Sequence, residues 1–135
     1  MNCMTLPATF QEAQPRNPDD LSGDYAVHLV AWYLPFPIRF LGHKKVFRQD
    51  AEGTTGYNSF LGGLVRTGHF RVERGRAADG ADVTKISYDV PRNWFFMRPL
   101  TDEVREIESG KFLGRGMMDL FGKPRNVFWF TVTKL

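Results

Sequence analysis

The chain has 135 residues, of which 42% are hydrophobic, 14% aromatic and 24% charged, with a formal net charge of +3. This length is typical of one domain with a sizeable core, and it excludes two independent domains. The basic residues are spread along the chain, and Glu73 interrupts the modest cluster of Arg71, Arg74 and Arg76. We therefore expect no nucleic-acid partner, because a nucleic-acid-binding face usually concentrates its basic residues.

The compartment is indicated by the cysteine count and by the apolar segments. Cys3 is the single cysteine, so the chain cannot form an internal disulfide and a reducing compartment is expected. The first residues lack the basic and long apolar regions of a secretory signal. Residues 27–41 are the most apolar stretch, but prolines and charged residues interrupt them, and a membrane helix needs about 20 apolar residues. We predict a cytoplasmic protein without a membrane span.

The N-terminal part predicts a leader followed by strands. Residues 5–20 hold three prolines and no hydrophobic periodicity, which indicates a flexible leader over 1–20 and a single domain over 21–135. A first strand is expected over 25–33, where both alternating sets of side chains are largely apolar. Pro35 and Pro37 should end its pairing, and a less regular strand is expected over 44–48.

The middle of the chain continues this pattern. The glycine-rich residues 53–63 predict a short strand between turns, and 64–73 form a further strand candidate. Residues 83–90 alternate as in a strand with one buried face. Residues 101–107 begin with a threonine that could cap a helix, although a short strand fits the same residues.

Two final strands are predicted over 111–120 and 126–134. They flank the turn 121–124, where Pro124 is expected to end pairing. The unbroken β-branched and aromatic run 127–132 is typical of a strand that is covered on both faces or closes a barrel.

The fold class that follows is all-β: an antiparallel barrel of seven or eight strands with at most one short helix. We favour a barrel over a sandwich because closure removes exposed strand edges. Gly56, Gly68, Gly114 and Gly116 suit the bends or close approaches of a curved sheet. A barrel of about eight strands can enclose one small ligand.

Several segments resemble known barrels. Leu21-Ser-Gly-Asp-Tyr25 resembles the Gly-x-Trp opening of lipocalin-like barrels, with Tyr in place of Trp. The segments 42–47, 112–119 and 128–133 resemble the uncharacterised bacterial lipocalin-like proteins with a GXWXG opening and a DUF4334 region. This resemblance implies a lipocalin-like barrel and carries over no activity and no functional residue.

No catalytic or metal motif of recognised spacing occurs. We therefore select candidate site residues by the face of the predicted strand on which each residue lies. His28 alternates with Val30 and Trp32. If that face points inward, His28 would be the only titratable group on an apolar wall and could bind or protonate a ligand. If it points outward, His28 is a hydrogen-bonded residue near the barrel end. Arg115 would meet an acidic ligand group if inward, and is a surface arginine if outward. The three histidines lack the spacing of metal ligands, so we predict no metal.

Other candidates are aromatic or sulfur-containing. Tyr57 could hydrogen-bond a ligand at the barrel mouth or belong to a turn. Trp32, Met117 and Trp129 could line an apolar pocket or be ordinary core residues. Residues 94–97 follow a proline and could cover the mouth or form a dimer patch.

The predicted function is the binding of a small, mostly hydrophobic molecule inside the barrel, with an acidic group on the ligand if Arg115 faces inward. The candidate ligand-binding residues are His28, Trp32, Tyr57, Arg115, Met117 and Trp129. One alternative is an isomerase or cyclase that uses His28 or a tyrosine as acid or base, and another is a homodimeric interaction module. A haem barrel with an axial histidine is a further alternative, although no cofactor is predicted. Asp102, Glu103 and Glu106 have the spacing of a solvated helix face and suggest no hydrolase.

Overall fold

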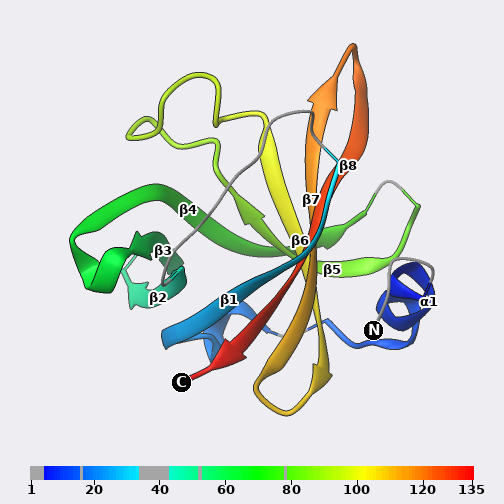
Figure 1. Ribbon diagram of the computed structural model, residues 1–135, viewed down its shortest axis with the longest axis horizontal. Coiled ribbons are helices and arrows are strands. Elements are labelled where there is room, and N and C mark those ends of the chain that lie inside the picture. The colour runs from blue at the N-terminus through cyan, green and yellow to red at the C-terminus, as the bar shows by residue number, and fades with distance from the viewer. Residues whose placement is uncertain (1–4, 16, 34–42, 52, 78) are drawn as a thin grey trace.

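The computed structural model describes residues 5–15, 17–33, 43–51, 53–77 and 79–135; Cys3, Pro35 and Pro37 lie outside these ranges. Eight strands form a closed antiparallel barrel in sequence order, and β8 pairs with β1 to close it (Figure 1). The strands are β1 (Gly23–Trp32), β2 (Lys44–Asp50), β3 (Gly53–Phe60), β4 (Val65–Arg76), β5 (Asp82–Ser87), β6 (Leu100–Glu108), β7 (Lys111–Leu120) and β8 (Lys123–Lys134). One short helix, α1 (Leu6–Glu12), and two 3-10 turns, η1 (Pro18–Asp20) and η2 (Leu61–Gly63), accompany them. The all-β barrel is confirmed.

The two ends of the barrel differ. In an up-and-down barrel alternate connections lie at the same end, so residues 61–64, 88–99 and 121–122 share one end, which we call the mouth. The opposite end, which we call the base, carries η1 and the β4–β5 and β6–β7 connections. Among the described residues, no helix is long and apolar enough to cross a membrane.

Residues 101–107, which fit either a helix or a strand, form most of β6. This strand pairs with β5 and β7, and both of its faces are covered. Asp102 and Val104 point into the barrel, whereas Glu103 and Arg105 face outward and are also buried. The helical alternative is therefore wrong, because pairing on both edges outweighs a weak capping signal.

The predicted end of pairing at Pro124 is also wrong. Leu120 pairs with Lys123 and Asp119 with Pro124, so the turn consists of Phe121 and Gly122 alone. The described pairing of β1 with β8 reaches only Phe128 on β8, so Pro124 lies beyond it. A proline is tolerated where a strand has a neighbour on one side only.

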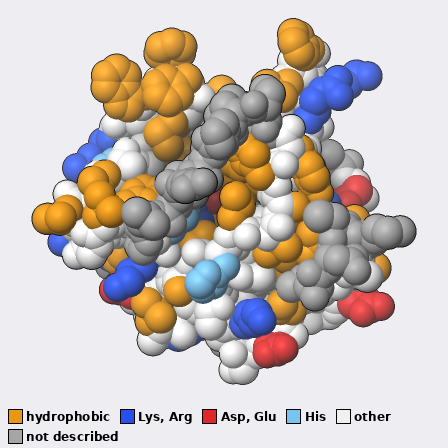
Figure 2. Space-filling model, in the orientation of Figure 1, with side chains coloured by type: hydrophobic (Ala, Val, Ile, Leu, Met, Phe, Trp, Pro, Cys, Tyr) orange, Lys and Arg blue, Asp and Glu red, His pale blue; other side chains and the backbone are white. Residues whose placement is uncertain are grey.

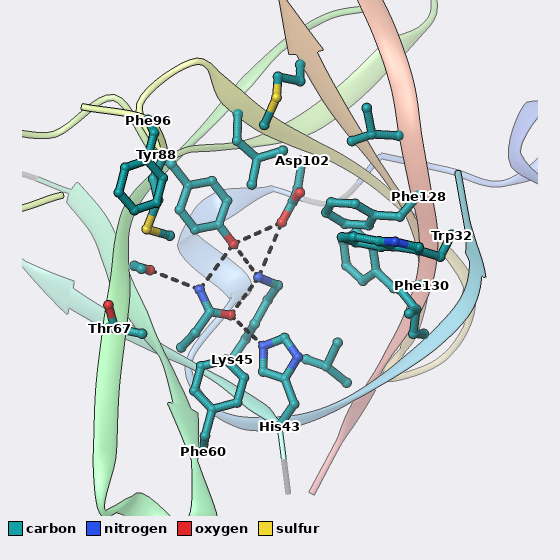
Figure 3. A pocket seen from close by; sticks show the side chains of 18 residues that line it. Trp32, His43, Lys45, Phe60, Thr67, Tyr88, Phe96, Asp102, Phe128 and Phe130 are labelled. Carbon is teal, nitrogen blue, oxygen red and sulfur yellow. Dashed lines mark hydrogen bonds and ion pairs between the residues drawn. The ribbon is translucent and has the colours of Figure 1, made fainter. Parts of the chain in front are cut away.

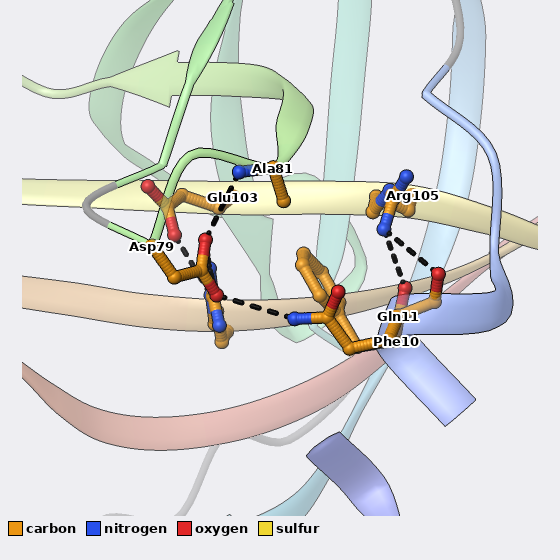
Figure 4. Close-up of polar contacts among 7 residues, drawn as sticks. Phe10, Gln11, Asp79, Ala81, Glu103 and Arg105 are labelled. Carbon is orange, nitrogen blue, oxygen red and sulfur yellow. Dashed lines mark hydrogen bonds and ion pairs between the residues drawn. The ribbon is translucent and has the colours of Figure 1, made fainter. Parts of the chain in front are cut away.

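The N-terminal residues include an ordered helix on the outside of the barrel (Figures 1 and 4). Leu6 and Phe10 of α1 are fully buried, and Phe10 meets Trp129 edge-on with ring centroids 5.8 Å apart. They share this outer cluster with Ala77, Val83, Leu113 and Trp129. Arg105 donates from Nη1 to the carbonyl oxygens of Phe10 and Gln11 at 2.9 and 3.3 Å. The helix thus lies against β6 and covers part of the outer face of β7 and β8, which accounts for the apolar residues on that face.

The base half of the barrel interior is a packed core. Its buried side chains are Leu21, Tyr25, Phe47, Phe70, Val72, Ile86, Val104, Phe112 and Val132, and Tyr88 and Phe130 of the same cluster border the mouth half. Gly114 and Gly116 face inward, where a Cβ atom would lie 2.3 Å from the rings of Phe130 and Phe128 respectively. These two glycines make room for the aromatic rings, which confirms the close approach expected there.

Candidate functional site

The mouth half of the interior is hollow. A cavity of about 300 Å³ lies above the packed core, and most of its wall is apolar (Figure 3). The apolar lining residues are Val27, Leu29, Trp32, Phe60, Phe96, Met97, Leu100, Met118, Val127, Phe128 and Phe130. A cavity of this size and polarity lies within the range found for small-molecule sites.

A cluster of polar side chains forms the floor of this cavity, and it joins four strands or strand ends. Lys45 Nζ lies 3.2 Å from Asp102 Oδ2 and 2.9 Å from Asn58 Oδ1, and it also donates to the Tyr88 hydroxyl. Tyr88 donates to Asp102 Oδ2 at 3.0 Å. All four residues are at least 95% buried. We call Lys45, Asn58, Tyr88 and Asp102 the floor cluster.

The hydrogen-bonding capacity of the floor cluster is almost fully used. The three hydrogens of the Lys45 ammonium have three acceptors. The Asn58 amide donates to the Gly68 carbonyl at 2.9 Å and to the Tyr88 hydroxyl at 3.2 Å. Within the described chain, Asp102 Oδ1 is the one atom of the cluster with no hydrogen-bond partner. The capacity that remains is therefore that of an acceptor.

Burial acts in opposite directions on the two charged members of the floor cluster. It lowers the pKa of Lys45 and raises the pKa of Asp102, and the charge of each residue partly offsets the shift of the other. An ammonium–carboxylate pair and its neutral counterpart carry the same net charge of zero. The floor is thus uncharged overall. Burial and the nearby Asp102 carboxylate raise the pKa of Tyr88 well above its usual value, so its hydroxyl stays protonated.

His43 extends the floor cluster toward the mouth. Its Nε2 lies 2.8 Å from Asn58 Oδ1, and because an amide oxygen can only accept, Nε2 is the donor. Burial and the charge of Lys45 lower the pKa of His43 from 6.5 to about 4. The ring is stacked on Phe60 with centroids 4.5 Å apart. His43 is therefore a neutral hydrogen-bond donor near pH 7.

Of the six residues chosen from the sequence, the structure places Trp32 in the cavity wall, stacked on Phe128 with ring centroids 5.6 Å apart. His28 is exposed, and its neighbours Val27 and Leu29 line the cavity instead. Trp129 is buried under α1 in the outer cluster.

The other three also lie outside the cavity. Met117 is half-buried and precedes the cavity residue Met118. Tyr57, on the opposite face of β3 from Asn58, lies between Arg48 and Arg66 and accepts a hydrogen bond from Arg48 at 3.2 Å. The structure does not gather the six residues into one site.

Arg115, the expected partner of an acidic ligand, lies on the outside of the barrel. Its Nε donates to Glu103 Oε1 at 2.7 Å, and its Nη2 lies 3.4 Å from Asp79 Oδ2. The guanidinium carbon sits 4.4 Å from the centroid of the Phe10 ring. Arg115 thus helps to hold α1 and the β4–β5 connection on the outer face.

The floor cluster could have been found by one sequence signal, which is a polar residue in phase with the apolar residues of its strand. Lys45 is in phase with Phe47, Tyr88 with Ile86, and Asp102 with Val104. The signal is weak in any single strand, because the inward phase is known only once the barrel is closed. Among the described residues, no three His, Cys, Asp or Glu side chains lie close enough together to hold a metal ion.

The fold and site define a class, a closed eight-stranded antiparallel barrel with an apolar cavity at one end. The fold is similar to that in a crystal structure of a protein from Thermomonospora curvata, with a TM-score of 0.59 and 17% sequence identity. The alignment covers 100% of this chain and 88% of that one. No family model and no curated protein matches the sequence.

Proposed function

We propose that the protein is a lipocalin-like barrel that binds one small, mostly apolar and uncharged molecule in the cavity at its mouth. The observation that carries this proposal is the apolar wall above a buried, charge-balanced floor. Burial of the ligand's apolar surface supplies the binding free energy, at roughly 25 cal/mol per Å² before the costs of association.

The charge balance of the floor supports an uncharged ligand. A ligand carboxylate would have to displace Asp102 from Lys45, and the arginine expected to meet it lies outside the barrel. The spare acceptor, Asp102 Oδ1, favours a hydroxyl or amine hydrogen over an anion. The preferred ligand thus carries at most one hydrogen-bond donor at the end that meets the floor.

The volume supports a small ligand. An engineered dry cavity of about 150 Å³ binds benzene, so a cavity of twice that volume suits a molecule of roughly two rings or an equivalent aliphatic chain. The cavity here measures about 300 Å³.

Catalysis by a tyrosine is the alternative for the same cavity, and among the described residues Tyr88 is the one tyrosine that lines it. A general base works best with a pKa near the ambient pH, whereas burial moves the pKa of Tyr88 the other way. The raised pKa of Tyr88 therefore favours binding over proton abstraction by this residue.

Native mass spectrometry of the purified protein, compared with a denatured sample, tests for a co-purified small molecule. A second test uses the uncharged two-ring fluorescent dye 6-propionyl-2-(dimethylamino)naphthalene and two adjacent variants. Met118→Trp fills the cavity, whereas Met117→Trp adds the same bulk outside it. We expect Met118→Trp to weaken dye binding by about tenfold or more and Met117→Trp to leave it unchanged. Equal binding by both variants would contradict a site in the cavity.

A further inference from the structure

Exposed apolar side chains gather at the mouth of the barrel. Ten large hydrophobic side chains are exposed among the described residues, and Leu135 is the one that lies away from the mouth half. The other nine are Leu29, Tyr33, Leu61, Leu64, Val65, Trp94, Phe95, Phe96 and Phe121. Single exposed apolar residues are ordinary, but a concentration of them at one end marks an interaction surface.

The most exposed of these side chains project from three separate connections. Leu64 after η2 is 86% exposed, Phe95 between β5 and β6 is 81% exposed, and Phe121 between β7 and β8 is 98% exposed. Figure 2 shows hydrophobic side chains standing out from the mouth in two groups, with a basic side chain beside one of them. Phe96 also lines the cavity, so this surface is continuous with the cavity wall.

The backbone at two of these tips is unfavourable for the residue that occupies it. Leu61 has φ of 53° and Phe121 has φ of 55°, and they are the two non-glycine residues with positive φ in the described chain. Positive φ is uncommon for any residue other than Gly, Asn or Asp, and a two-residue hairpin turn such as Phe121-Gly122 strongly prefers those residues. A bulky apolar residue that is disfavoured by its turn and packs against little in its own chain indicates a role outside the chain.

The charges around these tips are mainly basic. Five basic residues and two acidic residues are exposed in the described mouth connections and the strand ends beside them. The basic ones are Arg66, Arg92, Arg98, Lys123 and Arg125, and the acidic ones are Asp89 and Asp119. Arg98 is paired with Asp89 at 3.0 Å. The other four lie close to the apolar tips in sequence: Arg66 follows Leu64 by two residues, Arg92 precedes Trp94 by two, and Lys123 and Arg125 follow Phe121.

We propose that the mouth of the barrel docks on an anionic phospholipid bilayer. The tips that carry Leu64, Trp94, Phe95 and Phe121 insert between the lipids, and the surrounding basic side chains contact the headgroup phosphates. Protruding tryptophan and phenylalanine with basic neighbours are the pattern of an interfacial surface, because aromatic rings suit the headgroup level and cations are attracted to anionic lipid. Separate tips flanked by cations differ from the core of a protein–protein interface, which is depleted of charge. This inference does not depend on what the cavity binds.

The test is flotation of the full chain with vesicles of phosphatidylcholine alone and of phosphatidylcholine mixed with phosphatidylglycerol. We expect the protein to float with the mixed vesicles and to be released as the salt concentration rises. Trp94 reports insertion, because its fluorescence should shift to shorter wavelength with the mixed vesicles and the shift should be lost in Trp94→Phe. Failure to associate with the mixed vesicles at low salt would overturn the proposal.

Variants separate docking from folding. Asparagine suits this turn better than phenylalanine, so the thermal stability of Phe121→Asn should equal or exceed that of the parent chain. Its partitioning onto vesicles should fall by about tenfold, which is the factor expected for the loss of one large apolar side chain. Leu135→Asn removes an exposed apolar residue away from the mouth and should partition normally. Equal loss in both variants would overturn the proposal. So would a concentration-dependent dimer that Phe121→Asn abolishes, because a second copy would then be the occupant of this surface.

Discussion

Lys45 and Asp102 form a buried ion pair whose partners come from strands that are not adjacent in the barrel. Lys45 Nζ also lies 5.2 to 5.6 Å from the ring centroids of Phe70, Tyr88 and Phe130. Aromatic faces attract a cation, which helps to offset the cost of removing the ammonium from water. The pair is thus held at the boundary between the packed core and the cavity.

We expect Asp102→Asn to lower the free energy of unfolding by about 3–5 kcal/mol, because it leaves the buried Lys45 ammonium without its counter-charge. Urea denaturation measures this change. Asp89→Asn is the matched control, since its partner Arg98 is exposed and such pairs contribute at most about 1 kcal/mol. If the two variants lost the same stability, the Lys45–Asp102 pair would contribute no more than a surface pair.

His43 should make stability depend on pH in a defined window. Its pKa is about 4 in the folded chain, against the ordinary value of 6.5 that applies when the chain is unfolded, so the unfolded chain binds its proton first as the pH falls. The contribution of His43 is absent above pH 6.5 and becomes increasingly destabilising between pH 6.5 and 4, to on the order of 3 kcal/mol. The check is to measure unfolding free energies across this range for the parent chain and His43→Gln. The variant should lack this part of the slope, and an unchanged slope would contradict the assignment.

At the scale of elements, β7 and β8 fit together through inward glycines that face large aromatic rings. Gly114 pairs with Phe130 and Gly116 with Phe128, and the rings occupy the space that side chains at 114 and 116 would need. Small residues opposite large ones keep this tightly curved pair of strands at close-packed density.

Gly114→Ala should destabilise the barrel by about 1–3 kcal/mol, because its methyl group would overlap the Phe130 ring. Combining it with Phe130→Leu should cost less than the sum of the two single changes, as a double-mutant cycle in urea would show. Gly75→Ala is the control, since its nearest neighbour is the flexible Lys85 side chain. Strict additivity of the first two changes would refute the steric explanation.

The elements themselves were largely predictable from the sequence. Strong alternation or an apolar run located β1, β5, β7 and β8, and the predicted bounds of β7 were those observed. Helix α1 was missed because its buried residues, Leu6 and Phe10, occur one turn apart in a seven-residue helix, which is too short to show a period. The inward phase of β1 could not be determined, because Val30 and Ala31 pack in the outer cluster and make both faces apolar.

At the scale of the whole molecule, the floor cluster is a product of barrel closure. Lys45, Asn58, Tyr88 and Asp102 come from β2, β3, the end of β5 and β6, and nothing in their local sequence spacing places them together. The presence of a cavity could be predicted from the barrel fold alone. The identity of its polar lining residues could not, because it depends on the register of every strand pair. A shift of one residue in any strand would have moved that strand's contribution to the outside.

The interior is divided between a packed base and a hollow mouth. This division affects which substitutions the protein can accumulate during evolution. The side chains that secure the barrel lie mainly in the base half, while those that shape the cavity, such as Val27, Leu29 and Met118, lie in the mouth half. Under the proposed function, substitutions in the cavity wall would alter ligand preference at little cost to folding. Related chains could then acquire new ligands one residue at a time while the packed base stays unchanged.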